Sequence, residues 1–142
     1  MKDIVEIARL IDKGHKAGCD MSFCETLMLS EIARVYNGTG PDSWPSWARA
    51  KLDEELKLFA PAVMVHDCDF EFSDGSRDQF YAANDRLTEN CVKLADARYS
   101  GWSPIKVWKR LRARAAGRLM GRLCNDFGWS AYLDAHKSKT MA

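Results

Sequence analysis

A histidine–aspartate pair and a glycine-rich loop are the two stretches of this sequence whose residue types and spacing could support chemistry together. The pair, His66 and Asp67, lies in the otherwise apolar run APAVMVHDCDF. Neighbouring residues on a helix leave its axis about 100° apart, so these side chains need two different partners. Metal-dependent phosphohydrolases built on such a pair need further histidine ligands, and His15 and His136 lie in no supporting motif. We therefore set that class aside.

The loop YNGTG ends 26 residues before His66 and offers oxygen ligands for calcium. Tyr36, Gly38 and Gly40 recur at every second position, and glycine lets a tight loop turn several carbonyls toward one point. Calcium takes backbone carbonyls together with carboxylates, so Asp67 would complete such a site. A helix C-cap followed by a Gly-Pro turn is the simpler alternative for the same loop.

Helices must position these groups. Ser22 with Glu25 predicts a capping box, and Pro61 suits the first turn of a helix. Apolar residues at helical spacing predict helices over 3–16, 22–37, 47–58, 61–72, 77–98 and 104–127. The turn SDGS makes the fourth and fifth of these an antiparallel pair, and no alternating strand pattern is convincing. We therefore predict an all-α fold with this pair at its centre and additional N- and C-terminal helices.

Composition predicts one globular domain over residues 1–142, since 46% of the residues are hydrophobic and 29% are charged. Five cysteines, an odd number without CxxC spacing, argue against a zinc knuckle and a disulfide framework. No apolar run approaches the roughly 20 residues that span a bilayer. The charged N-terminal stretch does not suit a signal peptide, so we expect a cytoplasmic protein as synthesised. Delivery in a phage particle or release from the cell stays open.

Charge is distributed unevenly along the chain. Residues 1–98 hold 12 basic and 18 acidic side chains, a net of −6, whereas residues 99–142 hold 9 and 2, a net of +7. The basic excess lies mostly between Lys106 and Arg122. Such a helix suits anionic lipid or nucleic-acid phosphate, and a solvated face is the simpler alternative.

The five tryptophans fall into two groups. Trp44 and Trp47 follow the glycine-rich loop and would suit either a lipid interface or plain packing. For Trp102, Trp108 and Trp129 we expect packing in the core or at helix ends.

The order of these motifs resembles the phospholipase A2 superfamily, especially its disulfide-poor bacterial and viral-capsid branches. In that family a Y-x-G-x-G loop precedes a helix bearing His-Asp, and an antiparallel helix supplies a second aspartate. Here the second helix reads YAANDRLTENC, and Asp85 falls 19 residues after His66. The resemblance covers residues 36–91, about forty per cent of the chain. Phe70 departs from the tyrosine that is common in the family, and Asp69 adds a negative charge as an outer calcium contact or an incidental surface residue.

The resemblance implies a mechanism and its residues. His66 would be the general base that takes a proton from an attacking water. Asp85 would accept the other imidazole N–H, and the Gly38 N–H would face the oxyanion. A calcium ion would bind the phosphate and polarise the ester carbonyl. Its implied ligands are Tyr36, Gly38, Gly40 and Asp67. The implied activity is calcium-dependent hydrolysis of phospholipid esters at a membrane surface.

The same arrangement bears on the cysteines and leaves two other functions open. With His66 facing Asp85, Cys68 and Cys91 would lie about 12 Å apart along the helix axes, too far for a disulfide. The first alternative function is a non-catalytic structural or interaction protein of a phage or prophage on the same fold. The second is nucleic-acid binding by the basic C-terminal helix, which is less favoured because no recognition motif accompanies it.

Overall fold

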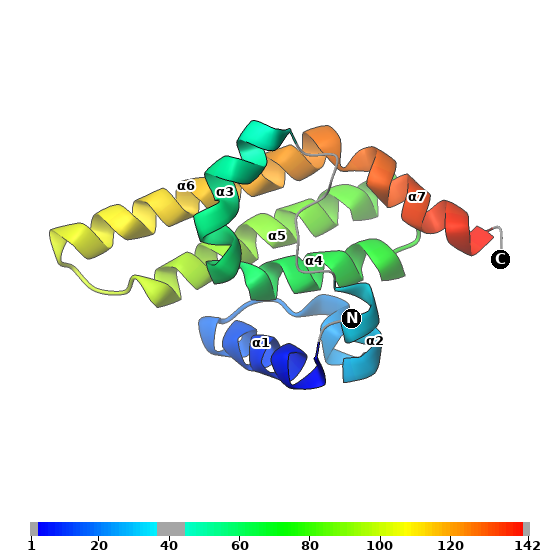
Figure 1. Cartoon of the computed structure of the whole chain (residues 1–142), viewed down its shortest axis with the longest axis horizontal. Helices are drawn as coiled ribbons and strands as arrows, with labels where there is room; N and C mark the ends of the chain where they lie inside the picture. Colours follow the sequence, from blue (N-terminus) through cyan, green and yellow to red (C-terminus); the bar gives the residue numbers. More distant parts are fainter. Residues whose placement is uncertain (1–2, 37–44, 141–142) are drawn as a thin grey trace.

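The structure, a computed structural model, describes residues 3–36 and 45–140. Over these residues all regular secondary structure is helical, with turns between the helices, which confirms the all-α class (Figure 1). The elements in chain order are α1 (Ile4–Ala17), the short 3₁₀ helix η1 (Ser22–Glu25), α2 (Leu29–Val35), α3 (Ser46–Leu58), α4 (Ala60–Phe72), α5 (Arg77–Arg98), α6 (Pro104–Phe127) and α7 (Trp129–Thr140). Within these described ranges no helix is both long and apolar enough to cross a membrane.

Local signals at the helix ends explain why the longer helices begin where the sequence predicts. The Asp3 carboxylate accepts a hydrogen bond from the Val5 N–H at the start of α1. Ser76 and Ser103 cap α5 and α6 in the same way. Gly18 ends α1 in the left-handed region, with a φ of 79° that favours glycine.

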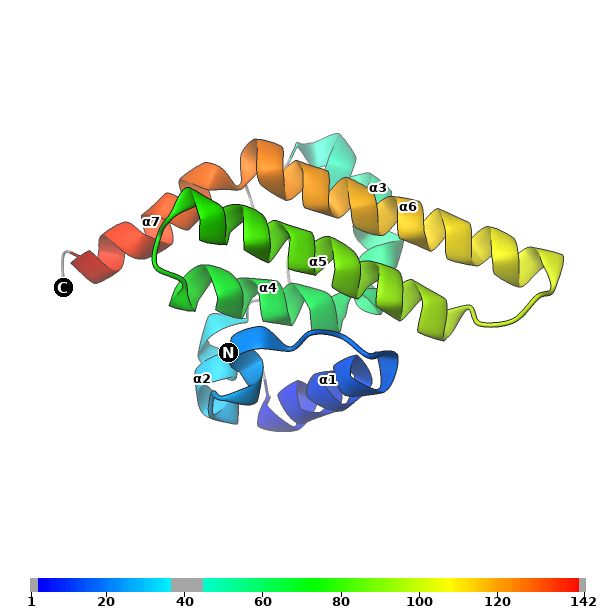
Figure 2. The same ribbon diagram turned by 180° about the vertical axis from the view of Figure 1, so that it is seen from behind.

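Three long helices form the centre of the molecule. The predicted pair is α4 and α5, which run antiparallel on either side of a short turn (Figures 1 and 2). Helix α6 returns along α5 and makes the most extensive helix–helix contact of the structure. Helices α1 and α2 pack against α4 on the other side, and α3 crosses α6. The side chains of α4 are therefore enclosed from several directions.

The segment around Ser22 differs from its prediction. The expected helix over 22–37 is broken into η1 and α2, and Ser22 adopts a φ of 49°. Its hydroxyl donates a hydrogen bond to Asp69 of α4 instead of capping a helix. Because a buried carboxylate gains more from that donor than a solvated helix end does, the tertiary contact overrides the capping signal.

Three further expectations have outcomes in the described residues. All five cysteines are free, as predicted, and all five are buried. Burial raises the pKa of the Cys124 thiol to about 12. The expected packing of Trp129 is confirmed, because its ring lies against Phe80. The same expectation is wrong for Trp102 and Trp108, which are exposed on the hairpin that joins α5 to α6.

We predict that Gly117→Ala destabilises the fold through the contact between α5 and α6. A Cβ atom at Gly117 would lie 2.6 Å from Cys91 Cβ, closer than two carbon atoms pack. The helices would have to separate, so the free energy of unfolding should fall by about 1–3 kcal/mol, despite the better helix propensity of alanine. Urea denaturation measures this loss. The exposed control on the same helix, Ala115→Ser, should change the free energy by less than about 0.5 kcal/mol. An unchanged or higher stability of Gly117→Ala would contradict the packing.

Candidate functional site

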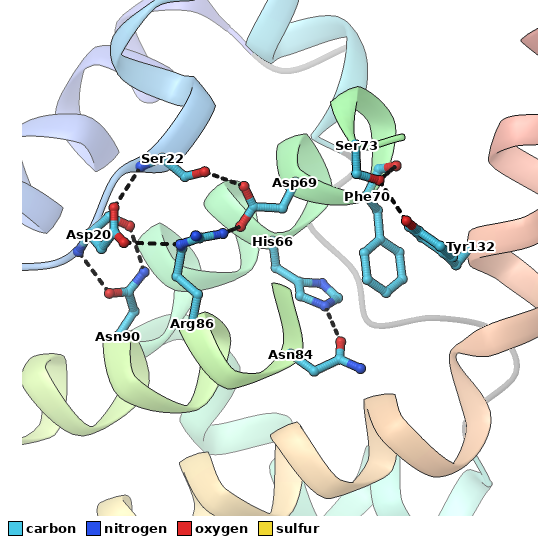
Figure 3. A network of polar contacts seen from close by, with 10 residues as sticks. All are labelled: Asp20, Ser22, His66, Asp69, Phe70, Ser73, Asn84, Arg86, Asn90 and Tyr132. Carbon is cyan, nitrogen blue, oxygen red and sulfur yellow. Dashed lines mark hydrogen bonds and ion pairs between the residues drawn. The ribbon is translucent and has the colours of Figure 1, made fainter. Parts of the chain in front are cut away.

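His66 lies at the centre of the candidate site, buried between α4 and α5. The residue is 5% exposed, and its Nε2 atom lies 2.8 Å from Oδ1 of Asn84 on α5 (Figure 3). Val65, Cys68 and Asp69 of α4 are also buried, because that helix is enclosed by α1, α2, α5 and α7. The imidazole therefore needs a polar partner from another helix, and Asn84 is that partner.

The predicted pair of His66 and Asp85 is wrong, since the contact is made by the residue before Asp85. Asp85 is exposed to solvent, whereas Asn84 is 1% exposed. One residue turns a helical side chain by about 100°, which separates a core position from a surface position. Asn84 lies three residues before Leu87 and seven before Cys91, both buried, so helical periodicity could have identified it.

A chain of hydrogen bonds sets the protonation of His66. Asn84 donates from Nδ2 to Oδ1 of Asn125 on α6, at 2.8 Å, which leaves its own carbonyl oxygen facing the imidazole. Nε2 of His66 therefore carries the proton and donates it, while Nδ1 keeps its lone pair. Burial lowers the pKa of His66 to about 4, although the hydrogen bond that Nε2 donates to Asn84 opposes that effect. The ring is thus neutral near pH 7, with Nδ1 as its basic atom.

Aromatic rings enclose the other side of the imidazole. The Phe70 ring centroid lies 4.1 Å from that of His66, and Phe70 also packs edge-on against Tyr132 of α7. The Tyr132 hydroxyl accepts a hydrogen bond from Ser73 and donates one to the Ser76 carbonyl. Helix α7, which the predicted helix ranges did not include, therefore holds the turn between α4 and α5.

Asp67 follows His66 directly in α4, so its side chain leaves the helix about 100° away from that of His66. Burial, and then the negative charges of Asp67 and Glu6, raise the pKa of the Tyr36 phenol to about 12. This shift indicates an electrostatic interaction between the Tyr36 phenol and Asp67, which are two of the four predicted calcium ligands. The role of the Tyr36 carbonyl as a ligand stays a prediction.

The other two predicted calcium ligands, Gly38 and Gly40, lie outside the described residues, as does Gly38 in its predicted oxyanion role. Within residues 3–36 and 45–140 no group of three or more histidine, cysteine or acidic side chains could hold a metal ion. A calcium site would therefore depend on backbone carbonyls beside the single carboxylate of Asp67, which is the donor set that the sequence predicts.

A second polar network, not predicted from the sequence, surrounds Asp69. This carboxylate is 1% exposed and accepts hydrogen bonds from Ser22 and from Nη1 of Arg86, the latter at 2.8 Å. Arg86 also donates from Nε to Asp20, which Asn90 holds through its backbone (Figure 3). Asp69 is therefore not a surface residue but the link between α4, α5 and the 20–22 segment. Burial raises its pKa, although both donors oppose that effect.

Comparison with known proteins adds no assignment to this geometry. A scan against protein-family models and searches of curated proteins and of solved structures found no match. The function of this protein is therefore inferred from its own motifs and contacts.

We predict that His66 makes the fold sensitive to mild acid. Its pKa is about 4 in the folded chain and about 6.5 in the unfolded chain, so the unfolded state binds more protons between these values. Stability should therefore fall as the pH drops from about 6.5 to 4, by up to about 3 kcal/mol. Urea denaturation across this range should show the fall in wild type and a smaller one in His66→Gln. His15→Gln, at an exposed histidine, is the control and should follow wild type. Parallel curves for wild type and His66→Gln would contradict the burial of a neutral ring.

We also predict that Arg86→Leu destabilises the fold strongly, because it leaves the buried Asp69 carboxylate without its cation. The free energy of unfolding should fall by about 3–5 kcal/mol, and adding Asp69→Asn should recover part of that loss. Arg114→Leu is the matched control, since it breaks a bidentate ion pair with Asp96 that is partly exposed on both sides. It should cost no more than about 1 kcal/mol in the same denaturation experiment. Equal losses for the two arginine variants would refute the structural role of Asp69.

Proposed function

We propose that this protein is a calcium-dependent esterase of the phospholipase A2 type that hydrolyses phospholipid ester bonds by attack of water. His66 is the general base, and Asn84 takes the positioning role that the sequence resemblance gave to Asp85. The observation that supports this proposal is the hydrogen bond between Nε2 of His66 and Asn84 across the antiparallel helices α4 and α5. It leaves Nδ1 with a free lone pair, which a general base requires.

The proposed reaction needs no serine or cysteine nucleophile. Nδ1 of His66 takes a proton from a water molecule as its oxygen attacks the ester carbonyl carbon. The tetrahedral intermediate then breaks the bond between the carbonyl carbon and the alcohol oxygen. The imidazolium returns its proton to that leaving oxygen, so the products are a fatty acid and a lysophospholipid.

Calcium, when bound, would supply positive charge for the lipid phosphate and for the ester carbonyl. The residues that would hold it are Asp67 and the predicted loop residues Tyr36, Gly38 and Gly40. One observation supports this ligand set, namely the electrostatic interaction of the Asp67 carboxylate with the Tyr36 side chain. The predicted Gly38 N–H would add a donor for the oxyanion.

The neutral side chain of Asn84 should make this reaction slow. A carboxylate at that position would stabilise the imidazolium through a full charge, whereas an amide offers only its dipole. The pKa of about 4 also makes His66 a weak base, because proton transfer is fastest when the pKa of the base lies near the working pH. We therefore expect slow turnover from the natural sequence.

A second candidate function follows from the burial of His66 and from its hydrogen bond to the neutral Asn84. A histidine that only packs in a protein core has the same two properties, because its buried ring nitrogen must be hydrogen-bonded. On this alternative the protein keeps the fold without the chemistry, as a structural or interaction protein of a phage or prophage.

Release of fatty acid from phospholipid vesicles, with calcium or with chelator, separates the two candidates. Wild type should show slow calcium-dependent release, and His66→Gln should lower the rate by about 10²–10⁴-fold. Asn84→Asp should raise the rate by at least about tenfold, because a charged partner stabilises the imidazolium. Asp67→Asn should abolish the calcium-dependent release, because it removes the charged calcium ligand. Asp85→Asn is the matched control, and its rate should equal that of wild type because the side chain is exposed.

Circular dichroism of each variant would establish that it remains helical before its rate is compared. With folded proteins and millimolar calcium, no release by either wild type or Asn84→Asp would favour the non-catalytic candidate. An Asp85→Asn rate far below that of wild type would restore the original pairing of His66 with Asp85.

A further inference from the structure

Four large apolar side chains are exposed together at one end of the molecule. They lie at the end of the hairpin formed by α5 and α6, and their exposed fractions are 91% for Trp102, 63% for Ile105, 58% for Trp108 and 56% for Leu111. The last three recur at intervals of three residues and so lie along one side of α6. Single exposed apolar residues are ordinary, but a group of this size marks an interaction surface.

The loop that carries Trp102 is held in place. Nη1 of Arg110 donates to the carbonyls of Tyr99 and Gly101, at 3.0 and 3.1 Å. Gly101 has a φ of 116°, a value that side chains other than glycine rarely adopt. The guanidinium of Arg110 also lies 5.8 Å from the centroid of the Trp102 ring. The protein therefore presents this indole outward from an ordered turn.

Positive charge surrounds the same apolar side chains. Lys106 and Lys109 are exposed between them, and the Arg112 guanidinium lies 5.6 Å from the Trp108 ring centroid. Between Pro104 and Asn125 the sequence of α6 contains no acidic residue. Arg112 has a nearby anion in Glu55 of α3, at 3.8 Å. The two exposed lysines, with Arg110, which donates to backbone carbonyls, therefore supply most of the positive charge of this surface.

We propose that this end of the hairpin docks onto an anionic lipid surface. Indole rings favour the interface of a bilayer, and isoleucine and leucine side chains gain free energy by entering the acyl boundary. Each lysine near an anionic leaflet adds attraction. Nucleic-acid phosphate would also attract the lysines, but it would leave Ile105 and Leu111 exposed to water. We refer to Trp102, Ile105, Lys106, Trp108, Lys109 and Leu111 as the docking surface.

The position of the docking surface suits this partner. The loop between α5 and α6 forms an extreme end of the molecule in both views (Figures 1 and 2). A flat surface can therefore reach it without obstruction from the other helices. None of its residues takes part in the network around His66, so docking goes beyond the proposed esterase activity and does not depend on it.

Co-sedimentation with vesicles in the presence of chelator tests this proposal without hydrolysis. The probe vesicles are mixed phosphatidylglycerol and phosphatidylcholine, with phosphatidylcholine alone for comparison. Wild type should bind the anionic vesicles more tightly, and high salt should weaken that binding because it screens the lysines. Trp102→Ser/Ile105→Ser should weaken binding by at least about tenfold. Lys106→Gln/Lys109→Gln should weaken it by about fivefold for each lysine.

Matched controls lie outside the hairpin. Trp47→Ser changes another indole, 59% exposed on α3, and Arg9→Gln/Lys13→Gln removes two exposed charges from α1. Both should bind as wild type does, as should His66→Gln.

Losses in these controls equal to those in the hairpin variants would overturn the proposal. So would duplex DNA binding that needs the lysines but neither Trp102 nor Ile105, or a dimer in solution that Trp102→Ser/Ile105→Ser abolishes. Vesicle binding in chelator, together with no fatty acid release in millimolar calcium by wild type or Asn84→Asp, would refute the esterase proposal and support the docking surface.

Discussion

One line of hydrogen-bonded side chains joins the three central helices, and the rest of the structure depends on keeping its groups paired. His66 of α4, Asn84 of α5 and Asn125 of α6 follow one another at distances of 2.8 Å. A buried amide or imidazole without a partner costs about 1–3 kcal/mol, so the helices are constrained in rotation as well as in distance. The close approach of α5 and α6 at Gly117 also constrains the distance between these helices. Polar pairing and tight packing together select one register for these helices.

The same line of side chains limits what His66 can do. Its neutral partner fixes the tautomer that a base requires, and its burial lowers its pKa to about 4, which weakens it as a base. An active site usually compensates for such burial with a charge, and here the carboxylates nearby have other roles. Asp69 is paired with Arg86, and Asp85 faces solvent. The site therefore holds the His66 ring firmly in one orientation, but among the described residues it offers no paired carboxylate to stabilise the imidazolium.

Signals confined to a few neighbouring residues were sufficient to determine much of this fold. Helix caps such as Ser76 and Ser103, and the proline that follows Ser103, act within one helical turn. The all-α class and the bounds of the longer helices could therefore be predicted to within about two residues. The free cysteines and the strongly basic character of α6 also follow from composition and spacing alone. Each of these properties is independent of how the helices later pack.

Only the tertiary structure decided which side chains meet. Asn84 rather than Asp85 faces His66, because the rotation of α5 against α4 is set by the whole α4–α5–α6 interface. Ser22 does not cap a helix as expected, because its hydroxyl donates to the buried carboxylate of Asp69, 47 residues away. Trp102 faces solvent because a hairpin end has no opposing helix to cover it. Sequence patterns report which residues a helix buries, whereas the identity of a partner depends on contacts between segments that are distant in the chain.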